Sequence, residues 1–169
     1  MVVGVSRNLW TVCLVAIAVA AMLNAGCEES GTSSGRIAGK VTINGTTWQV
    51  ELANTAEQRY QGLSDRKELP QGRGMLFVYP EPQQLTFCMR YCLIPLDIAF
   101  IDGQNRVVNM CTMETEPYGF ETKSYLSSGP AQYALEVPKG ALEAAGVKVG
   151  DKVEISSDIP SPAKAEPGP

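Results

Sequence analysis

The residues of this sequence with the clearest potential for chemistry are cysteines. Cys88 and Cys92 lie four positions apart in LTFCMRYCLIPLDIAFID (residues 85–102), and Cys111 follows. Zinc motifs repeat pairs of cysteines in turns, and redox pairs are usually Cys-x-x-Cys at the start of a helix. Because the sequence has neither pattern, we expect no metal site and no cofactor at these thiols.

Apolar residues alternate with the others over residues 85–92, which predicts a strand. In a strand, Cys88 and Cys92 would be about 13 Å apart at ~3.3 Å per residue, whereas the Cα atoms of a disulfide lie within ~7 Å. We therefore expect that these two cysteines are not bonded to each other and act as packing residues. A bridge between Cys92 and Cys111 across the bend at Pro95 remains open.

Three arginines and one aspartate form the second candidate group, namely Arg59, Arg66, Arg73 and Asp97. In one interpretation, the arginines line a cleft that binds a small anion or a saccharide, and Asp97 orients them. In the other, which we favour, Asp97 caps the end of a strand and holds an arginine against a loop. An open pocket of ~300 Å³ or more lined by Asp97 and two arginines would support the first interpretation.

The sequence contains no histidine, which excludes Ser-His-Asp and Cys-His catalysis and the zinc sites that need histidine. Asp97 paired with Asp65 or Asp102 would suit glycoside hydrolysis only at a separation of ~5–9 Å, and no motif around them indicates it. We therefore assign no catalytic residue.

Both ends of the chain are expected to lie outside the fold. Residues 1–26 combine one arginine, an apolar run and a small-residue end, as in a secretory signal peptide. The segment LNAGC resembles a bacterial lipoprotein cleavage box, in which Cys27 becomes the acylated first residue. Residues 27–36 have the composition of a flexible tether, and the proline-rich residues 158–169 that of a disordered tail.

Residues 37–157 suffice for one domain with one core. Short apolar or alternating segments separated by turn residues predict strands, and two short segments with helix caps predict helices. The expected strands are a hairpin within 36–53, then 74–79, 85–92, a hairpin within 96–110, 133–137 and 149–156, and the expected helices lie within 54–62 and 139–146. The fold class is therefore mostly β, a compact jelly-roll-like sandwich or barrel with two short helices.

Three segments carry a family resemblance: GRGMLFVY, FCMRYCLIPLDIAFID and ALEVPKGALEAAGVKVGDKVEI. In this order and spacing they resemble DUF192, also called UPF0127, a domain of unknown function in bacteria and archaea that is often exported or lipid-anchored. The resemblance implies a β-rich, jelly-roll-like fold and no established activity. The family commonly has Trp at the position of Cys88, an Asn-Thr pair at Tyr91 and Cys92, and Met at Ser64.

These features predict an exported, lipid-anchored, monomeric protein of the bacterial cell envelope that acts as a binding or accessory module. Its partners would be the membrane, through Cys27, and a small anionic or saccharide ligand. Glu28 after Cys27 favours the outer membrane. The alternative is an enzyme that acts on a saccharide or another envelope polymer through Asp97 and the nearby arginines. Loss of residues 1–26 leaves 13 basic and 18 acidic residues, a net charge of −5, which argues against nucleic-acid binding.

Lipidation at Cys27 is testable by intact mass spectrometry of protein extracted from membranes. We expect a mature chain that begins at Cys27 and carries the added mass of acyl groups. A soluble product that begins at another residue, or a chain that retains residues 1–26, would show that the processing prediction is wrong.

Overall fold

The structure, a computed structural model, describes residues 35–120 and 123–167, which belong to one compact unit. Its strands are β1 (Gly39–Ile43), β2 (Thr46–Ala53), β3 (Arg73–Gln83), β4 (Thr86–Phe87), β5 (Leu96–Ile101), β6 (Val107–Met113), β7 (Tyr125–Leu126), β8 (Ala131–Pro138) and β9 (Val153–Ile155). Its helices are α1 (Ala56–Gln61), α2 (Ala141–Ala144) and the 3-10 turn η1 (Pro162–Lys164). None of the helices in this part of the chain is long and apolar enough to cross a membrane.

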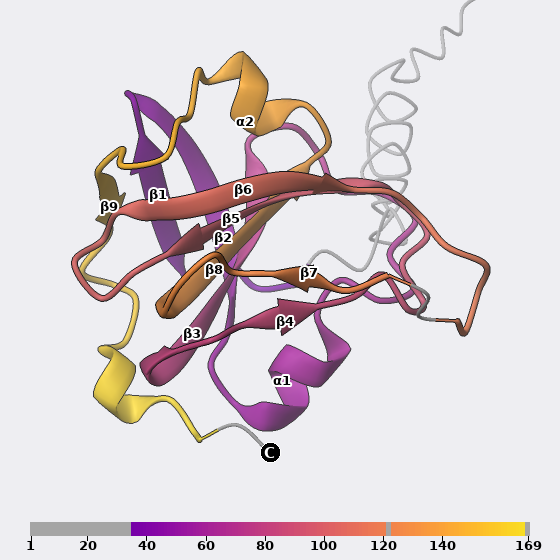
Figure 1. Cartoon of the computed structure of the whole chain (residues 1–169), viewed down its shortest axis with the longest axis horizontal. Coiled ribbons are helices and arrows are strands. Elements are labelled where there is room, and N and C mark those ends of the chain that lie inside the picture. Colours follow the sequence, from indigo (N-terminus) through magenta and orange to yellow (C-terminus); the bar gives the residue numbers. More distant parts are fainter. Residues whose placement is uncertain (1–34, 121–122, 168–169) are drawn as a thin grey trace, which may run out of the picture. The chain divides into compact units, whose positions relative to one another are not determined.

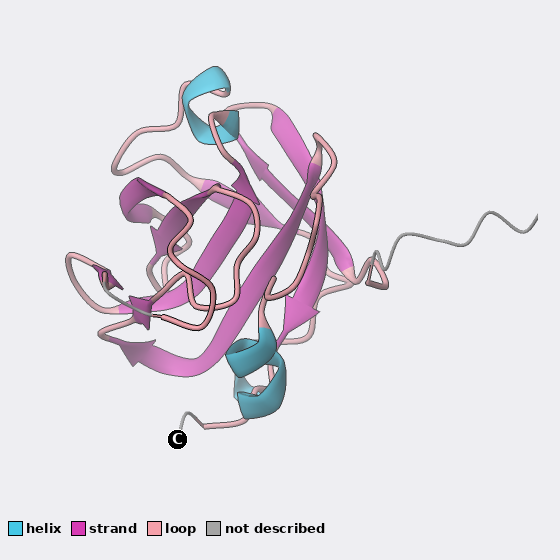
Figure 2. Cartoon of the chain, turned by 90° about the vertical axis from the view of Figure 1, so that its right-hand side faces the viewer, coloured by secondary structure: helices cyan, strands magenta, loops and turns pink. Residues whose placement is uncertain are grey.

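Seven strands form one sheet in the order β6-β5-β8-β3-β2-β1-β9, and the sheet curls into a half-barrel (Figures 1 and 2). Its two edges meet near the start of β6, where Val107 exchanges backbone hydrogen bonds of 2.8 and 3.0 Å with Gly150 and Asp151. α2 lies at one end of the half-barrel and α1 at the other (Figure 1). The predicted mostly-β sandwich or barrel with two short helices is confirmed.

Local sequence explains the first hairpin and the first helix. Asn44 and Gly45 both have positive φ, 51° and 79°, as the tight turn between β1 and β2 requires. At the start of α1, the Thr55 hydroxyl accepts from the Gln58 amide at 3.2 Å, and the Gln58 side chain accepts from the Thr55 amide at 3.2 Å. This capping box satisfies donors that a helix of only six residues otherwise leaves unpaired.

The sheet buries apolar side chains on both faces. The first cluster, on one face, includes Val41, Trp48, Leu76, Ile101, Leu135 and Val137, and the second cluster, on the other face, includes Phe77, Leu85, Met89, Ile98, Phe100 and Ala134. The ribbon of β4 and β7 lies over the second cluster, because Phe87 of β4 packs edge-on against Phe77 and Phe100 at 4.9 and 5.7 Å between ring centroids. The central strands β5 and β8 are consequently covered on both sides.

The predicted strand over residues 85–92 is wrong beyond Phe87. The chain instead makes a tight turn in which the Cys92 amide donates to the Met89 carbonyl at 3.0 Å, and Tyr91 has a φ of +62°. Met89 is fully buried in the second cluster, so the turn is anchored by its own apolar side chain. The extended distance of about 13 Å between Cys88 and Cys92 therefore does not apply.

The prediction of a disordered tail is corrected for its described part, residues 158–167. Ile159 and Ala165 are buried in the first cluster, and the Glu166 amide donates to the Asn54 carbonyl at 2.9 Å. Gly39 of β1 makes room for this packing, since a Cβ there would lie 2.6 Å from the Ile159 side chain. The proline-rich composition concealed two apolar anchors, which were too few to form a periodic pattern.

Candidate functional site

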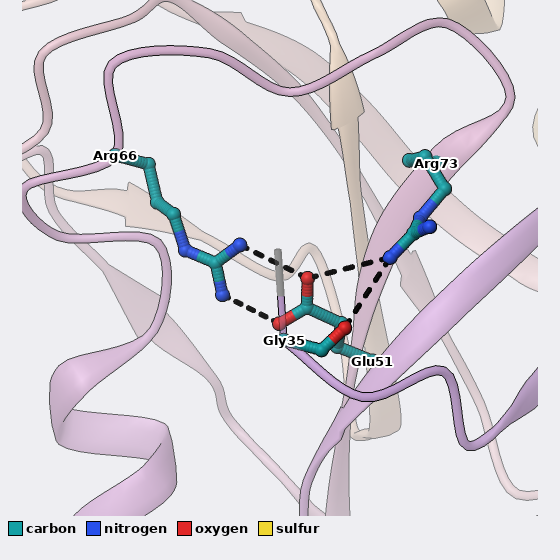
Figure 3. A network of polar contacts seen from close by, with 4 residues as sticks. All are labelled: Gly35, Glu51, Arg66 and Arg73. Carbon is teal, nitrogen blue, oxygen red and sulfur yellow. Dashed lines mark hydrogen bonds and ion pairs between the residues drawn. The ribbon is translucent and has the colours of Figure 1, made fainter. Parts of the chain in front are cut away.

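Two of the four predicted site residues, Arg66 and Arg73, converge on a buried acid that the sequence did not suggest (Figure 3). Arg66 donates to both carboxylate oxygens of Glu51, at 3.0 and 2.5 Å. The Arg73 guanidinium lies 3.9 Å from the same carboxylate and donates to the Gly35 carbonyl at 3.3 Å. Glu51 is only 5 % exposed, so these contacts supply the charge compensation that burial demands.

Asp97 has a separate structural role. Its carboxylate accepts from the Thr112 hydroxyl at 2.8 Å and from the backbone amide of Leu142 at 3.2 Å. Leu142 lies in the first turn of α2, whose N-cap is Gly140 and offers no side chain. Asp97 thus caps α2 from the neighbouring sheet. The predicted cap at a strand end is wrong, since Asp97 caps a helix instead, and among the described residues no arginine is its partner.

The four predicted residues do not share one cleft. A hollow of about 330 Å³ beside α2 is lined by Asp97, Thr112, Leu142 and Lys148 among others, and no arginine lines it. Arg59 lies elsewhere, on α1, where its guanidinium packs 4.7 Å from the centre of the Tyr79 ring. The pocket of Asp97 with two arginines, which would have supported the cleft interpretation, is not formed in the part of the chain that the structure describes.

A different cavity, which we call the Glu136 cavity, lies beneath α1 on the face of the second cluster. Its volume is about 190 Å³. Arg59 and Tyr60 come from α1, Tyr79 from β3, Cys88 and Cys92 from the two sides of the turn after β4, and Glu136 from β8; Gln61, Gly62, Leu63, Ser64, Thr86, Phe87 and Arg90 complete the lining. The cavity therefore gathers residues that lie far apart in the sequence.

Glu136 is the most unusual group in this cavity. It is 5 % exposed, and burial raises the pKa of its carboxyl from 4.5 to about 8. Among the described residues, no hydrogen bond or ion pair to this carboxyl offsets the desolvation, which is the sole cause of the shift. A buried, uncompensated acid that faces a cavity is the pattern that functional sites produce.

The neighbouring groups respond to the same burial. Desolvation raises the pKa of the Cys92 thiol to about 12, and the charges of Glu136 and Cys88 act in the same direction. Desolvation also raises the pKa of Tyr79, opposed by the charge of Arg59. At neutral pH, Cys92 and Tyr79 are therefore protonated, and Glu136 is mostly so.

The turn between Cys88 and Cys92, two of the lining residues, is strained. Positive φ is uncommon for a residue as bulky as Tyr91, and Asp65, with a φ of +60°, donates its amide to the Tyr91 carbonyl at 2.8 Å. The Tyr118 hydroxyl donates to the Asp65 carboxylate at 2.7 Å, and the Tyr91 and Tyr118 rings pack edge-on at 5.0 Å. Such local strain persists where surrounding contacts enforce it, and it is frequent at binding sites.

Sequence reasoning missed Glu136, Glu51 and the tyrosines. The one available signal was Glu136 itself, a single acid in YALEV, a run that otherwise predicts a strand buried on both faces. The tyrosines and Cys92 gave no signal, because only the turn after β4 and the packing of α1 bring them to one place.

The architecture and the cavity define a small half-barrel domain with a buried acid as its distinctive feature. The family model of DUF192, described as "Uncharacterized ACR", matches residues 39–155, and the chain belongs to this family. The earlier resemblance is thereby confirmed. Cys88 and Cys92, which depart from the family pattern noted in the sequence, line the Glu136 cavity, and Tyr91, which also departs from it, lies in the turn between them.

Relatives and solved structures agree with this assignment. A UPF0127 protein of Thermococcus sibiricus is 28% identical over 126 residues, 70% of this chain and 77% of the relative, and one of Pyrococcus furiosus is 28% identical over 108 residues, 63% and 85%. The structure of a Novosphingobium aromaticivorans protein of unknown function has a TM-score of 0.62 at 37% sequence identity. The match covers 68% of this chain and 83% of that protein. A protein from Sinorhizobium meliloti described as a putative transcription regulator has a TM-score of 0.61 at 28% sequence identity. The match covers 72% of this chain and 97% of that protein.

The Glu51 network yields a first stability prediction. Glu51→Gln leaves the Arg66 and Arg73 charges half-buried without their carboxylate, and we expect a loss of about 3 kcal/mol in the free energy of unfolding. Chemical denaturation measures it. The matched control is Glu114→Gln, which breaks an exposed pair with Lys139 and should cost at most about 1 kcal/mol. Equal losses in the two variants would contradict the structural role of Glu51.

The Glu136 carboxyl yields a prediction about pH. The folded state keeps its proton up to a pKa of about 8, whereas the unfolded state releases it near 4.5, so rising pH destabilises the fold across this window. At about 1.4 kcal/mol per pKa unit, the loss amounts to roughly 4–5 kcal/mol.

Glu136→Gln removes this loss. The variant should match the wild type near pH 5 and be more stable at pH 9, as measured by denaturation at a series of pH values. The exposed Glu154→Gln is the control and should show no such divergence. A difference between Glu136→Gln and wild type that stays constant with pH would mean that the Glu136 carboxylate is compensated in the fold.

Proposed function

We propose that this protein is an exported, lipid-anchored module that binds a small organic anion, including an acidic saccharide, in the Glu136 cavity. The observation that carries the binding role is the buried Glu136 carboxyl, which lines a cavity and has no hydrogen-bond partner among the described residues. Export and anchoring are supported by the sequence of residues 1–27, which lie outside the described residues. Monomeric state and the outer membrane remain predictions from the sequence.

The charge of the cavity favours an anion. Arg59 donates to the carbonyl oxygens of Val78 at 3.0 Å, Glu166 at 2.7 Å and Pro167 at 3.0 Å, which are neutral partners. In the part of the chain that the structure describes, no carboxylate is paired with Arg59. With Glu136 mostly protonated at neutral pH, the charged side chains that line the cavity are the cations Arg59 and Arg90, and the carboxyl can donate a hydrogen bond to a bound oxyanion.

Size and shape favour a small ligand with one apolar face. The cavity of about 190 Å³ is below the ~300–1,000 Å³ of sites for drug-sized molecules. At its rim, the Tyr60 ring is 71 % exposed, and the Arg90 guanidinium lies 4.8 Å from its centre. An exposed aromatic ring beside hydrogen-bonding groups suits the apolar face of a sugar ring.

The alternative of an enzyme that acts on a saccharide or another envelope polymer through Asp97 has no supporting geometry. Asp97 is engaged by Thr112 and by the amide of Leu142, and Arg66 and Arg73 are committed to Glu51. Only Arg59, among the predicted ligand-binding residues, lines the Glu136 cavity. The binding proposal therefore retains Arg59 and replaces Asp97 by Glu136.

A thermal-shift titration at pH 7 with a matched pair of compounds tests the proposal. Glucuronate and glucose share a sugar ring and differ in the carboxylate. We expect glucuronate to raise Tm by several degrees at saturation, because a ligand at 100 times its Kd adds about 2.7 kcal/mol of stability. Glucose should raise Tm less. Succinate, an anion without a sugar ring, shows whether the carboxylate alone suffices.

Two variants locate the effect. Arg59→Gln should abolish the glucuronate shift, whereas Arg106→Gln, which removes an arginine bonded to the Gly150 carbonyl outside the cavity, should leave it unchanged. A shift that survives Arg59→Gln and Glu136→Gln would place the ligand elsewhere. No shift with any of a broad set of small anions and sugars would overturn the binding proposal.

A further inference from the structure

Cys88 and Cys92 lie on either side of the tight turn that follows β4. The hydrogen bond from the Cys92 amide to the Met89 carbonyl, 3.0 Å long, closes this turn, and residues one and four of such a turn have Cα atoms within ~7 Å. Cys88 directly precedes the turn and Cys92 ends it, and both line the Glu136 cavity. The two cysteines therefore flank one turn and line one cavity.

The two thiols differ in their surroundings. Cys92 packs against the second cluster, and its desolvation keeps the thiol protonated. Both cysteines are half-buried in the wall of the cavity, but Cys88 is not among the residues that pack against the second cluster. In thiol–disulfide exchange, the accessible thiol attacks an incoming disulfide and a second, sheltered thiol resolves the mixed disulfide. This asymmetry assigns attack to Cys88 and resolution to Cys92.

A sheltered thiol needs a proton acceptor before it can attack, because the thiolate is the nucleophile. Glu136 lines the same cavity, and its charge is the second-largest influence on Cys92 after desolvation. No other group in the described residues hydrogen-bonds to the Glu136 carboxyl, so it is available for proton transfer. A general base whose pKa is close to the working pH is the most effective kind.

We propose that Cys88, Cys92 and Glu136 form a thiol–disulfide exchange site, with a small-molecule disulfide as the oxidant. This inference goes beyond ligand binding and does not depend on it. In the first step, Cys88 releases its proton to water, and its thiolate attacks one sulfur of the disulfide RSSR, whose S–S bond breaks. One RS⁻ leaves and takes up a proton from water, and Cys88 carries the mixed disulfide.

In the second step, the ionised form of Glu136, a minor fraction at neutral pH, takes the proton of Cys92, and the Cys92 sulfur attacks the sulfur of Cys88. The mixed S–S bond breaks, and the second RS⁻ takes the proton from Glu136. The net reaction converts two protein thiols and one RSSR into a Cys88–Cys92 disulfide and two RSH. Two electrons pass from the protein to the small disulfide. The reverse reaction, with excess RSH, restores both thiols.

Glutathione disulfide is the probe, and the sequence provides a convenient assay. The full chain, purified in detergent, is treated with the probe, quenched with acid, and digested with trypsin without reduction. Trypsin cleaves after Arg90, between the two cysteines, so Cys88 falls in peptide 74–90, Cys92 in 91–106 and Cys111 in 107–123. Of the other two cysteines, Cys13 is lost with residues 1–26 in the mature chain, and Cys27 falls in the acylated peptide 27–36.

We expect peptide 74–90 to be linked to peptide 91–106, and excess reduced glutathione to separate them. A link between 91–106 and 107–123 would instead mean a Cys92–Cys111 bridge and would overturn the proposal. Glutathione retained on both Cys88 and Cys92, with no linked peptides, would also overturn it, because the thiols would then react without resolving each other. Absence of any reaction at Cys88 has the same consequence.

Variants separate the roles. Cys92→Ser should stop at a glutathione adduct on Cys88, whereas Cys111→Ser, the control outside the cavity, should behave as the wild type. Glu136→Gln should slow conversion of the Cys88 adduct to the disulfide by roughly 100-fold, the usual effect of a general base, without slowing formation of the adduct. An unchanged second step in this variant would exclude Glu136 from the reaction. Because the readout needs no bound anion, failure here leaves the binding titration independent.

Discussion

Burial of β8 on both faces is the constraint on which the rest of this structure depends. β8 pairs with β3 on one side and β5 on the other, and side chains on its two faces enter two different apolar clusters. An ionisable group on this strand must therefore be paired with an opposite charge, be held in its neutral form, or take part in binding or reaction. Glu136 is such a group, and no residue in the described chain compensates it, so its carboxyl is held neutral over most of the physiological range.

The same sheet face shows both solutions to this constraint. Glu51, Met75, Glu136 and Ile98 lie in register across four neighbouring strands. Strand β3, with Met75, lies between the two glutamates, so their Cα atoms are about 10 Å apart at the usual strand spacing. Glu51 is paired with Arg66 and Arg73, which approach it from the loop and strand that follow α1 (Figure 3). Glu136 has a cavity where Glu51 has arginines. We therefore assign a structural role to Glu51 and propose a reactive role for Glu136.

The family, the fold class, the first hairpin and the capping box were predictable, because each rests on local periodicity or on residues adjacent in sequence. The strand assigned to residues 88–92 failed because Met89 is anchored in the second cluster and Tyr91 takes a positive φ, which the alternation of residue types does not encode. The grouping of Asp97 with three arginines failed for a similar reason. Sequence shows which charges exist, but partners such as Glu51 and the amide of Leu142 are chosen by the packing of strands and helices distant in the chain.

The last described residues of the chain are fastened to the cavity wall. Arg59 donates to the carbonyl oxygens of Glu166 and Pro167 while its guanidinium lies over Tyr79, so one side chain joins the C-terminal segment to the lining. Coupling between binding sites is reciprocal. A ligand in the cavity that stabilises the position of Arg59 would also strengthen the attachment of the C-terminal segment, and release of that segment would weaken ligand binding by the same factor. A processing event, a fusion or a partner that takes hold of the C-terminus would therefore act on the cavity without entering it.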